Sequence, residues 1–127
     1  MRDFVNNFSV VAAVVPQVLT ATNTSAAISV AGFDGITIVG NAGAIVGAGN
    51  FTPKIQECET AGGTYTDVAA IDLIGVFPAV ILTNTTFKVG YKGGKGFLKT
   101  VNTLNSGTSL ALGMEVIKGW PKSSPAA

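Results

Sequence analysis

The sequence predicts an all-β fold, an antiparallel β-sandwich of the jelly-roll kind, and two observations support this prediction. Short apolar runs alternate with polar residues at a period of two, which places every second side chain on the same face of a strand. Sixteen glycines separate these runs, together with clusters of Asn, Thr and Ser, as turns do in all-β proteins. No window of the chain has the 3.6-residue spacing of an amphipathic helix.

The first predicted strands lie before residue 40. They are expected at Val18–Thr22, Ser25–Val30 and Gly35–Val39. Because these runs follow one another with short polar breaks, we expect them to form a meander within one sheet. A flexible glycine-rich loop is expected next, at Gly40–Asn50, with Ile45 and Val46 at its tip.

The second half of the chain completes a set of about eight strands. They are expected at Phe51–Cys58, Tyr65–Val68, Thr86–Tyr91, Phe97–Leu104 and Ser109–Ile117. A faltering alternation near Glu57 predicts a bulge, and Gly93-Gly94 predicts a hairpin between the two strands around it. Residues Ala69–Phe77 suit either a helical turn or a wide connection. Two packed sheets bury one face of every strand, and a closed barrel is the alternative.

A chain of 127 residues fits one domain. We expect an N-terminal arm at residues 1–16, the sandwich at residues 17–121 and a C-terminal tail at residues 122–127. The apolar run Val10–Val15 is too short to cross a membrane, and Asp3 interrupts the basic start of a signal peptide. The arm is therefore expected to remain part of the working protein.

Charged residues make up only 12 % of the chain, about half the usual share. A surface with so few charges favours association with other chains. The side chains expected to contact a partner are Phe4, Val5, Phe8, Val10 and Val11 in the arm, Ile45 and Val46 in the loop, and Trp120 near the chain end. The net charge of +1 and the small size of the Lys92–Lys99 cluster argue against nucleic acid as a partner.

The residue inventory argues against an enzyme. The chain has no histidine and a single cysteine, Cys58, so a Ser-His-Asp triad is excluded and a zinc site is not expected. Glu57 and Glu59 fall on one face of a regular strand, as a glycosidase pair requires, and with Asp67 and Asp72 they suit calcium. We favour solvated side chains over both, and expect no catalytic residue, metal or cofactor. Gly94-Lys95 lacks the rest of a phosphate loop and is read as a turn.

Five longer stretches carry a resemblance to a known family. They read PQVLTATNTSAAISVAGF at Pro16–Phe33, GAIVGAGNFTPKIQE at Gly43–Glu57, TDVAAIDLIGVFPA at Thr66–Ala79, VGYKGGKGFLKTVNTLNSGTS at Val89–Ser109 and VIKGWP at Val116–Pro121. Together they resemble small virion proteins of tailed bacteriophages and prophages, whose genes tend to lie near the major capsid gene.

The resemblance implies a structural protein of the virion, with no catalytic residues to carry over. Its expected role is capsid decoration, in which the protein sits on the capsid surface and reinforces contacts between shell subunits. The expected partners are the major capsid protein and further copies of this chain. A minor head or tail protein is one alternative. A carbohydrate-binding module is another, with Tyr65, Tyr91 and Trp120 as the aromatic candidates, although Tyr91 is expected to lie in the core.

Overall fold

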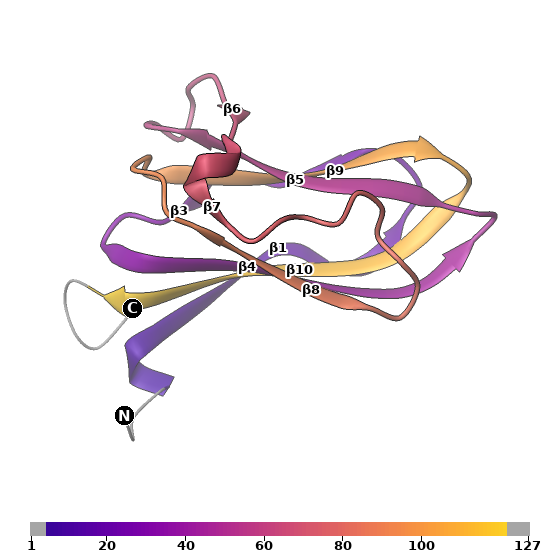
Figure 1. The fold of residues 1–127 in the computed structure, drawn as a ribbon, viewed down its shortest axis with the longest axis horizontal. Helices are drawn as coiled ribbons and strands as arrows, with labels where there is room; N and C mark the ends of the chain where they lie inside the picture. The colour runs from indigo at the N-terminus through magenta and orange to yellow at the C-terminus, as the bar shows by residue number, and fades with distance from the viewer. Residues whose placement is uncertain (1–4, 122–127) are drawn as a thin grey trace.

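The computed structural model describes residues 5–121, with the side chains of Asn7, Trp120 and Pro121 outside the described set. Within this range the regular structure consists of strands and two short 3-10 turns, η1 (Val5–Asn7) and η2 (Ala70–Asp72). The strands form two antiparallel sheets packed face to face (Figure 1). The predicted all-β sandwich is therefore confirmed.

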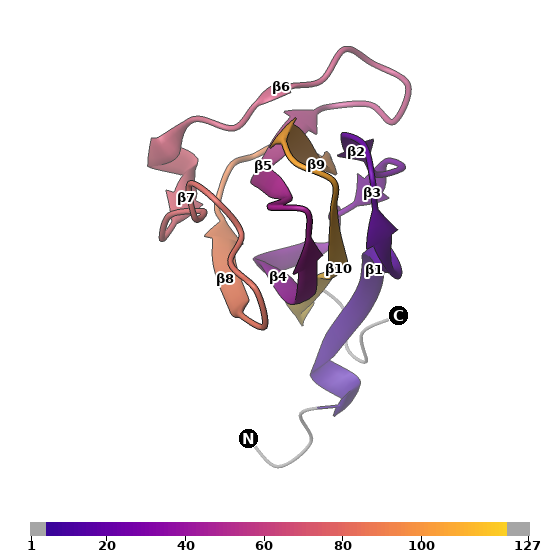
Figure 2. The same ribbon diagram turned by 90° about the vertical axis from the view of Figure 1, so that its right-hand side faces the viewer.

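Sheet A contains the longer strands. Its order is β1 (Phe8–Leu19), β10 (Ser109–Pro121), β4 (Phe33–Val46), β8 (Thr86–Tyr91) and β7 (Leu73–Ile74). Sheet B has the order β2 (Asn23–Thr24), β9 (Phe97–Ser106), β5 (Asn50–Cys58) and β6 (Thr66–Asp67), and β3 (Ile28–Ser29) also pairs with β9. Strand β1 is thus one outer edge of sheet A and the short β7 is the other, as the end-on view in Figure 2 shows.

Two tight turns connect the sheets at one end of the sandwich. The chain passes from β4 to β5 through Gly47–Gly49, and from β9 to β10 through Gly107–Thr108. These turns contact each other, since the Thr108 N–H donates a 3.2 Å hydrogen bond to the Gly47 carbonyl. Because β4 pairs with β10 and β5 pairs with β9, residues 33–58 and 97–121 run antiparallel through both layers, as in a jelly roll.

The core fills the space between the sheets. Strand β10 contributes every second side chain to it, and Leu110, Leu112, Met114 and Val116 are all at most 2 % exposed. Sheet A also contributes Ile36, Ile38, Val89 and Tyr91, and sheet B contributes Phe51, Ile55 and Leu98. Each aliphatic side chain buried in this way stabilises the fold by about 1.5–3 kcal/mol. The alternation read from the sequence correctly predicts the inward face of β4, β8 and β10.

The N-terminal boundary predicted at residue 16 is wrong. Residues 8–19 form strand β1, which pairs with β10 from Phe8 opposite Gly119 to Leu19 opposite Leu110. Val14 is buried in the core, so this segment is part of the sandwich. Its period of two is hidden in the sequence because two register shifts, between Ala12 and Val14 and between Val14 and Gln17, interrupt the ladder. Each shift moves the following side chains to the opposite face.

The flexible loop predicted at Gly40–Asn50 is also wrong. Strand β4 continues to Val46, and only a three-residue turn remains before β5. The glycines in this strand make room for neighbouring side chains: the space where a Cβ of Gly40 would lie is occupied by the Phe87 ring, and that of Gly43 borders Ala111. Glycine here reflects close packing instead of chain flexibility.

Three further predictions, a meander, a hairpin and a bulge, are wrong. The runs before residue 40 do not form a meander, because β1 and β4 flank β10 in sheet A while β2 and β3 pair with β9 in sheet B. Strands β8 and β9 lie in different sheets, so they do not form the predicted hairpin. The register of β5 against β9 is regular from Phe51 to Cys58, so the bulge near Glu57 is absent.

Candidate partner-binding surfaces

The residues predicted to contact a partner occupy several different environments. Val5 and Val10 are exposed, whereas Val11 is half-buried and packs against the core. Ile45 likewise packs against the core, and its neighbour Val46 is exposed. Phe8 is half-buried at the start of β1. Phe4 and the side chain of Trp120 lie outside the described residues.

The free edge of β1 is the first apolar surface of the molecule. Its twelve residues, FSVVAAVVPQVL, include no charged side chain. Val10, Val15 and Val18 are 48 %, 64 % and 62 % exposed. Edge strands are usually protected from pairing with other chains by lysine, by proline or by bulges. Strand β1 has Pro16 and its two register shifts but no charge, so it is suited to contact with another protein chain.

A second apolar surface lies at the opposite edge of sheet A, in residues 71–82. This segment includes β7, which pairs with β8, and then runs along the side of the sandwich between β8 and β5 (Figure 1), where Thr52 Oγ1 donates a hydrogen bond to the Ala79 carbonyl. Phe77 and Ile81 anchor it: the Phe77 ring meets the Phe87 ring edge-on at 6.3 Å, and the Ile81 N–H donates to the Phe51 carbonyl. The exposed large apolar residues here are Ile71, Ile74, Val76, Val80 and Leu82.

Sequence reasoning missed this second surface, because residues 69–77 suited more than one structure. A signal was nevertheless present. From residue 71 to residue 82 the sequence reads IDLIGVFPAVIL, with Asp72 as its only charged residue. So many consecutive apolar residues cannot all face one core when the chain is neither a helix nor a regular strand. Some of them must therefore be exposed.

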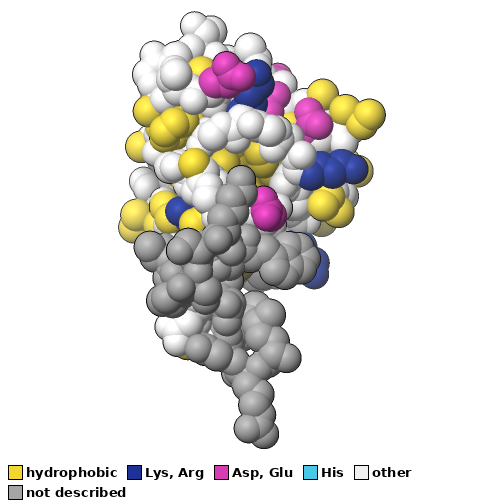
Figure 3. All heavy atoms as spheres, turned by 90° about the vertical axis from the view of Figure 1, so that its left-hand side faces the viewer, with side chains coloured by type: hydrophobic (Ala, Val, Ile, Leu, Met, Phe, Trp, Pro, Cys, Tyr) yellow, Lys and Arg dark blue, Asp and Glu magenta, His cyan; other side chains and the backbone are white. Residues whose placement is uncertain are grey.

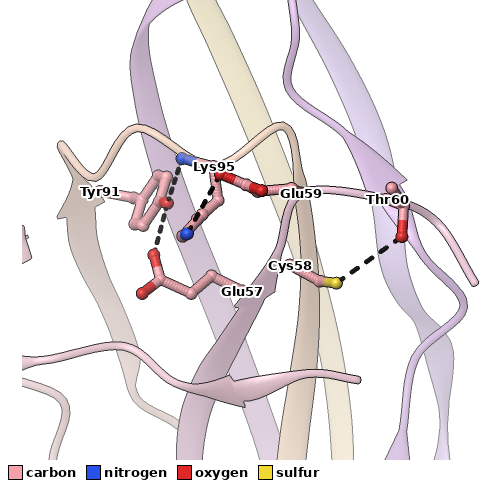
Figure 4. Close-up of polar contacts among 6 residues, drawn as sticks. All are labelled: Glu57, Cys58, Glu59, Thr60, Tyr91 and Lys95. Carbon is pink, nitrogen blue, oxygen red and sulfur yellow. Dashed lines mark hydrogen bonds and ion pairs between the residues drawn. The ribbon is translucent and has the colours of Figure 1, made fainter. Parts of the chain in front are cut away.

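The end of the sandwich opposite the two tight turns carries charged side chains of both signs beside apolar ones (Figure 3). Here the Tyr91 hydroxyl donates a 2.7 Å hydrogen bond to Glu57 Oε1 and accepts one of 3.2 Å from the Lys95 N–H (Figure 4). Lys95 Nζ lies 3.3 Å from Glu59 Oε1. Burial, with a further contribution from the Glu57 hydrogen bond, raises the pKa of Tyr91 well above its usual value. These contacts connect β8 in sheet A to β5 in sheet B.

Glu57 and Glu59 each contact a different residue, since Glu57 accepts a hydrogen bond from Tyr91 and Glu59 forms an ion pair with Lys95. Glu57 is half-buried against Tyr91, so only the exposed Glu59 matches the expected solvated side chain. Asp67 interacts instead with Gln56 and Lys54, whose hydrogen bonds lower the pKa of its carboxyl group. Among the described residues, no three His, Cys, Asp or Glu side chains lie close enough to hold a metal ion.

The glycine-rich turn between β8 and β9 borders a hollow of about 410 Å³. Its lining includes residues 30–34 on one side and residues 92–96 on the other. The turn leads directly into strand β9, whereas a phosphate loop leads into a helix whose N-terminus binds the anion. Gly94-Lys95 is therefore a connection between the sheets.

Two of the three aromatic residues considered for sugar binding, Tyr65 and Tyr91, have side chains that the structure describes. Tyr91 is 3 % exposed and belongs to the core, as predicted. The ring of Tyr65 is covered by Lys99, whose Nζ lies 4.5 Å from the ring centre. Cys58 is free and half-buried. No helix in residues 5–121 is long and apolar enough to cross a membrane.

An antiparallel sandwich of two sheets is the class of protein that these elements define, and one solved structure supports this fold. The crystal structure of the SPBc2 prophage-derived protein YomS matches with a TM-score of 0.51 at 13 % identity, over 88 % of this chain and 94 % of that one. The structure of infectious bursal disease virus, Gx strain, matches with a TM-score of 0.41 at 10 % identity, over 93 % of this chain and 34 % of that one.

No protein-family model matches the sequence, and no curated protein matches it. The likeness to YomS supports the fold. The resemblance to virion proteins of tailed bacteriophages stays a prediction.

Proposed function

We propose that this protein is a structural component of a bacteriophage virion, and specifically a capsid decoration protein that binds the assembled shell. The observation that carries the proposal is the free edge of β1, which has no charge and exposes Val10, Val15 and Val18. A protein that stayed alone in solution would risk aggregation through such an edge. A partner that covers the edge removes this risk.

Two further observations support the virion as the setting. The fold is shared with the SPBc2 prophage-derived protein YomS. The chain also has only 12 % charged residues, and obligate interfaces are more apolar than the free surface of a monomer. The proposed partner is the major capsid protein, and the proposed location is the capsid surface.

The two apolar surfaces suit a protein that bridges shell subunits. Residues 8–12 of β1, which precede the first register shift and Pro16, can add to an edge of a capsid protein sheet through their backbone N–H and C=O groups, with the exposed valines in neighbouring pockets. Strand β7, with the exposed Ile74, lies at the other edge of the same sheet, so it and the apolar residues that follow it are placed to contact a second subunit. A module with two separate contact edges reinforces a shell by joining neighbours.

Co-sedimentation with purified capsid shells of the phage that encodes the chain tests this proposal. The unmodified protein is expected to sediment with the shells. The V15E/V18E variant is expected to bind at least tenfold more weakly, because it places two carboxylates at the buried contact, where unpaired charge is costly. Both valines are more than 60 % exposed, so the variant is expected to fold.

The control variant A61E/T64E adds the same two charges at exposed positions of the turn between β5 and β6. It is expected to bind like the unmodified protein. Absence of the unmodified protein from the shell pellet contradicts a decoration role. Recovery with tail fractions instead would support the alternative of a minor tail protein, and binding to a glycan array would support a carbohydrate-binding module.

A further inference from the structure

The outer face of sheet A, which points away from sheet B, has no second layer among the described elements (Figure 1). Its side chains are those that alternate with the buried residues of β1, β10, β4 and β8. One row of directly paired residues crosses the whole face, from Val10 to Ile117, Thr37, Gly90 and Ile74. This row is apolar except for a threonine hydroxyl, and it continues from one outer edge of the sheet to the other.

The backbone at one end of this face is accessible to a close partner. Gly35 and Gly119 are paired there, and a Cβ built on Gly119 would meet only the Gly35 carbonyl oxygen, at 3.9 Å, among the described residues. Glycine inside a strand weakens it, and it often marks a place where another backbone approaches closely. A second sheet can therefore pack on this face at about the 10 Å spacing of a sandwich, or slightly closer.

One acidic and one basic side chain, Glu115 and Lys88, lie in the middle of the face on either side of strand β4. A second row of paired residues runs from Ala12 to Glu115, Val39 and Lys88. Glu115 and Lys88 are both exposed and lie two strands apart, on either side of Val39, at about 10 Å. The ion pairs among the described residues join Lys54 to Asp67 and Lys95 to Glu59, so Glu115 and Lys88 are not paired with each other.

We infer that a second copy of this chain covers the outer face of sheet A, related to the first by a twofold axis that passes over Val39 parallel to β4. Rotation about that axis exchanges the two sides of Val39. Glu115 of each copy then lies opposite Lys88 of the other, which gives two ion pairs from one acidic and one basic residue. A twofold axis perpendicular to the strands instead places like charges opposite each other.

The geometry of sheet packing is compatible with this arrangement. Stacked sheets cross at about 30°, which corresponds to an axis inclined by about 15° to β4. At about 5 Å from the axis such a crossing displaces the facing residues by only roughly 2–3 Å, well within the reach of a lysine side chain. The face measures about 20 Å across its strands and about 30 Å along them. It therefore buries roughly 1,200 Å² in total, which is the lower end of the range for stable protein–protein interfaces.

Sedimentation equilibrium of the full chain tests the inference over a range of protein concentrations. The unmodified protein is expected to show a monomer–dimer equilibrium. Each of E115K and K88E converts both ion pairs into like-charge contacts, and is expected to raise the dissociation constant at least tenfold. The E115K/K88E variant reverses every charge and restores both pairs, so its dissociation constant is expected to return to within threefold of the original.

A mixture provides an independent readout. E115K carries two lysines at these positions and K88E carries two glutamates, so an equimolar mixture of the two variants is expected to dimerise although neither does so alone. E59K, at an exposed position on the sheet B side of the molecule, is the control and is expected to leave the dissociation constant unchanged.

A purely monomeric unmodified protein, or a dimer that E115K and K88E leave intact, overturns the inference. So does a failure of the E115K/K88E variant to recover dimerisation while its circular dichroism matches the unmodified protein. Val10 and Ile74 belong both to this face and to the edges proposed to contact the capsid, so dimerisation is measured without shells and capsid binding is measured by co-sedimentation. A monomeric protein that still sediments with shells overturns this inference and leaves the proposed function standing.

Discussion

The Tyr91 hydroxyl donates a 2.7 Å hydrogen bond to Glu57 Oε1 across the two layers of the sandwich. Tyr91 ends strand β8 in sheet A, and Glu57 lies near the end of β5 in sheet B. The bond therefore joins the two sheets at the end where residues 30–32 and the Lys92–Gly96 turn also cross between them. The same hydroxyl also accepts the Lys95 N–H, so it fixes the turn as well.

Replacing Tyr91 with Phe is expected to destabilise the fold. The loss of a hydrogen bond to a charged acceptor costs about 1.5–3 kcal/mol, and the Lys95 N–H loses its partner too. E57Q keeps an acceptor oxygen at the same place and is expected to cost less than Y91F. Urea unfolding of the three proteins measures the difference, and equal stability of Y91F and the unmodified protein would show that the bond contributes nothing.

Stability is expected to fall at alkaline pH because of Tyr91. Burial, and then the Glu57 hydrogen bond, raise the pKa of this hydroxyl in the folded state, while in the unfolded chain it is about 10. A raised folded pKa contributes stability that is fully present below the unfolded pKa and is lost as the pH rises through the folded pKa. The difference in unfolding free energy between the unmodified protein and Y91F is therefore expected to shrink above pH 10. A constant difference between pH 8 and pH 11 would contradict this.

The hydroxyl of Thr100 is expected to reduce the stability of the core. It is fully buried, and its Oγ1 has no hydrogen-bond partner among the described groups. T100V keeps the shape and removes the unsatisfied oxygen, so it is expected to stabilise the protein by about 1 kcal/mol. T52V is the matched comparison, and it is expected to destabilise because Thr52 Oγ1 donates to the Ala79 carbonyl. Thermal melts of both variants test the opposite signs.

The two tight turns make Gly107 a sensitive position. Its φ is +81°, and a Cβ there would collide with the backbone of Ala48 in the neighbouring turn. G107A is expected to cost at least about 1 kcal/mol from the left-handed backbone alone, with the collision adding to it. G62A is the control, because nothing lies near a Cβ at that exposed turn. A melting temperature for G107A that equals that of G62A would mean that the turns do not pack as described.

Local patterns in the sequence predict the strands whose ladders are regular. Strand β8 is predicted with its observed limits, and the inward residues of β10 follow from their alternation. Strand β1 escapes the same reasoning because its two register shifts break the period. The error about the arm therefore comes from bulges, which insert residues without changing the composition of the strand.

Strand pairing depends on contacts between distant residues and is harder to predict. Gly93-Gly94 resembles a hairpin turn, but five residues separate β8 from β9, enough to cross the roughly 10 Å between packed sheets. The residues of the connection do not show whether the chain returns within the same sheet or crosses to the other sheet. The difference is made by the buried faces of both strands, which must line the same core from opposite sides.

The candidate contact residues show a similar limit. Val10 and Val46 are exposed and so accessible to a partner, but Val11 and Ile45 pack against the core. Consecutive residues of a strand point to opposite faces, so neighbours such as Val10 and Val11 cannot both serve one surface. Composition indicates that apolar contacts exist, and only the register of each strand decides which side chains make them.

The copy number of this protein in purified phage particles tests the proposed virion role most directly. Quantitative mass spectrometry gives the ratio of this chain to the major capsid protein. A decoration protein that covers the shell is expected in numbers comparable with the capsid subunits, and the ratio should fall when V15E/V18E replaces the natural chain. Absence of the protein from the particles would contradict the account.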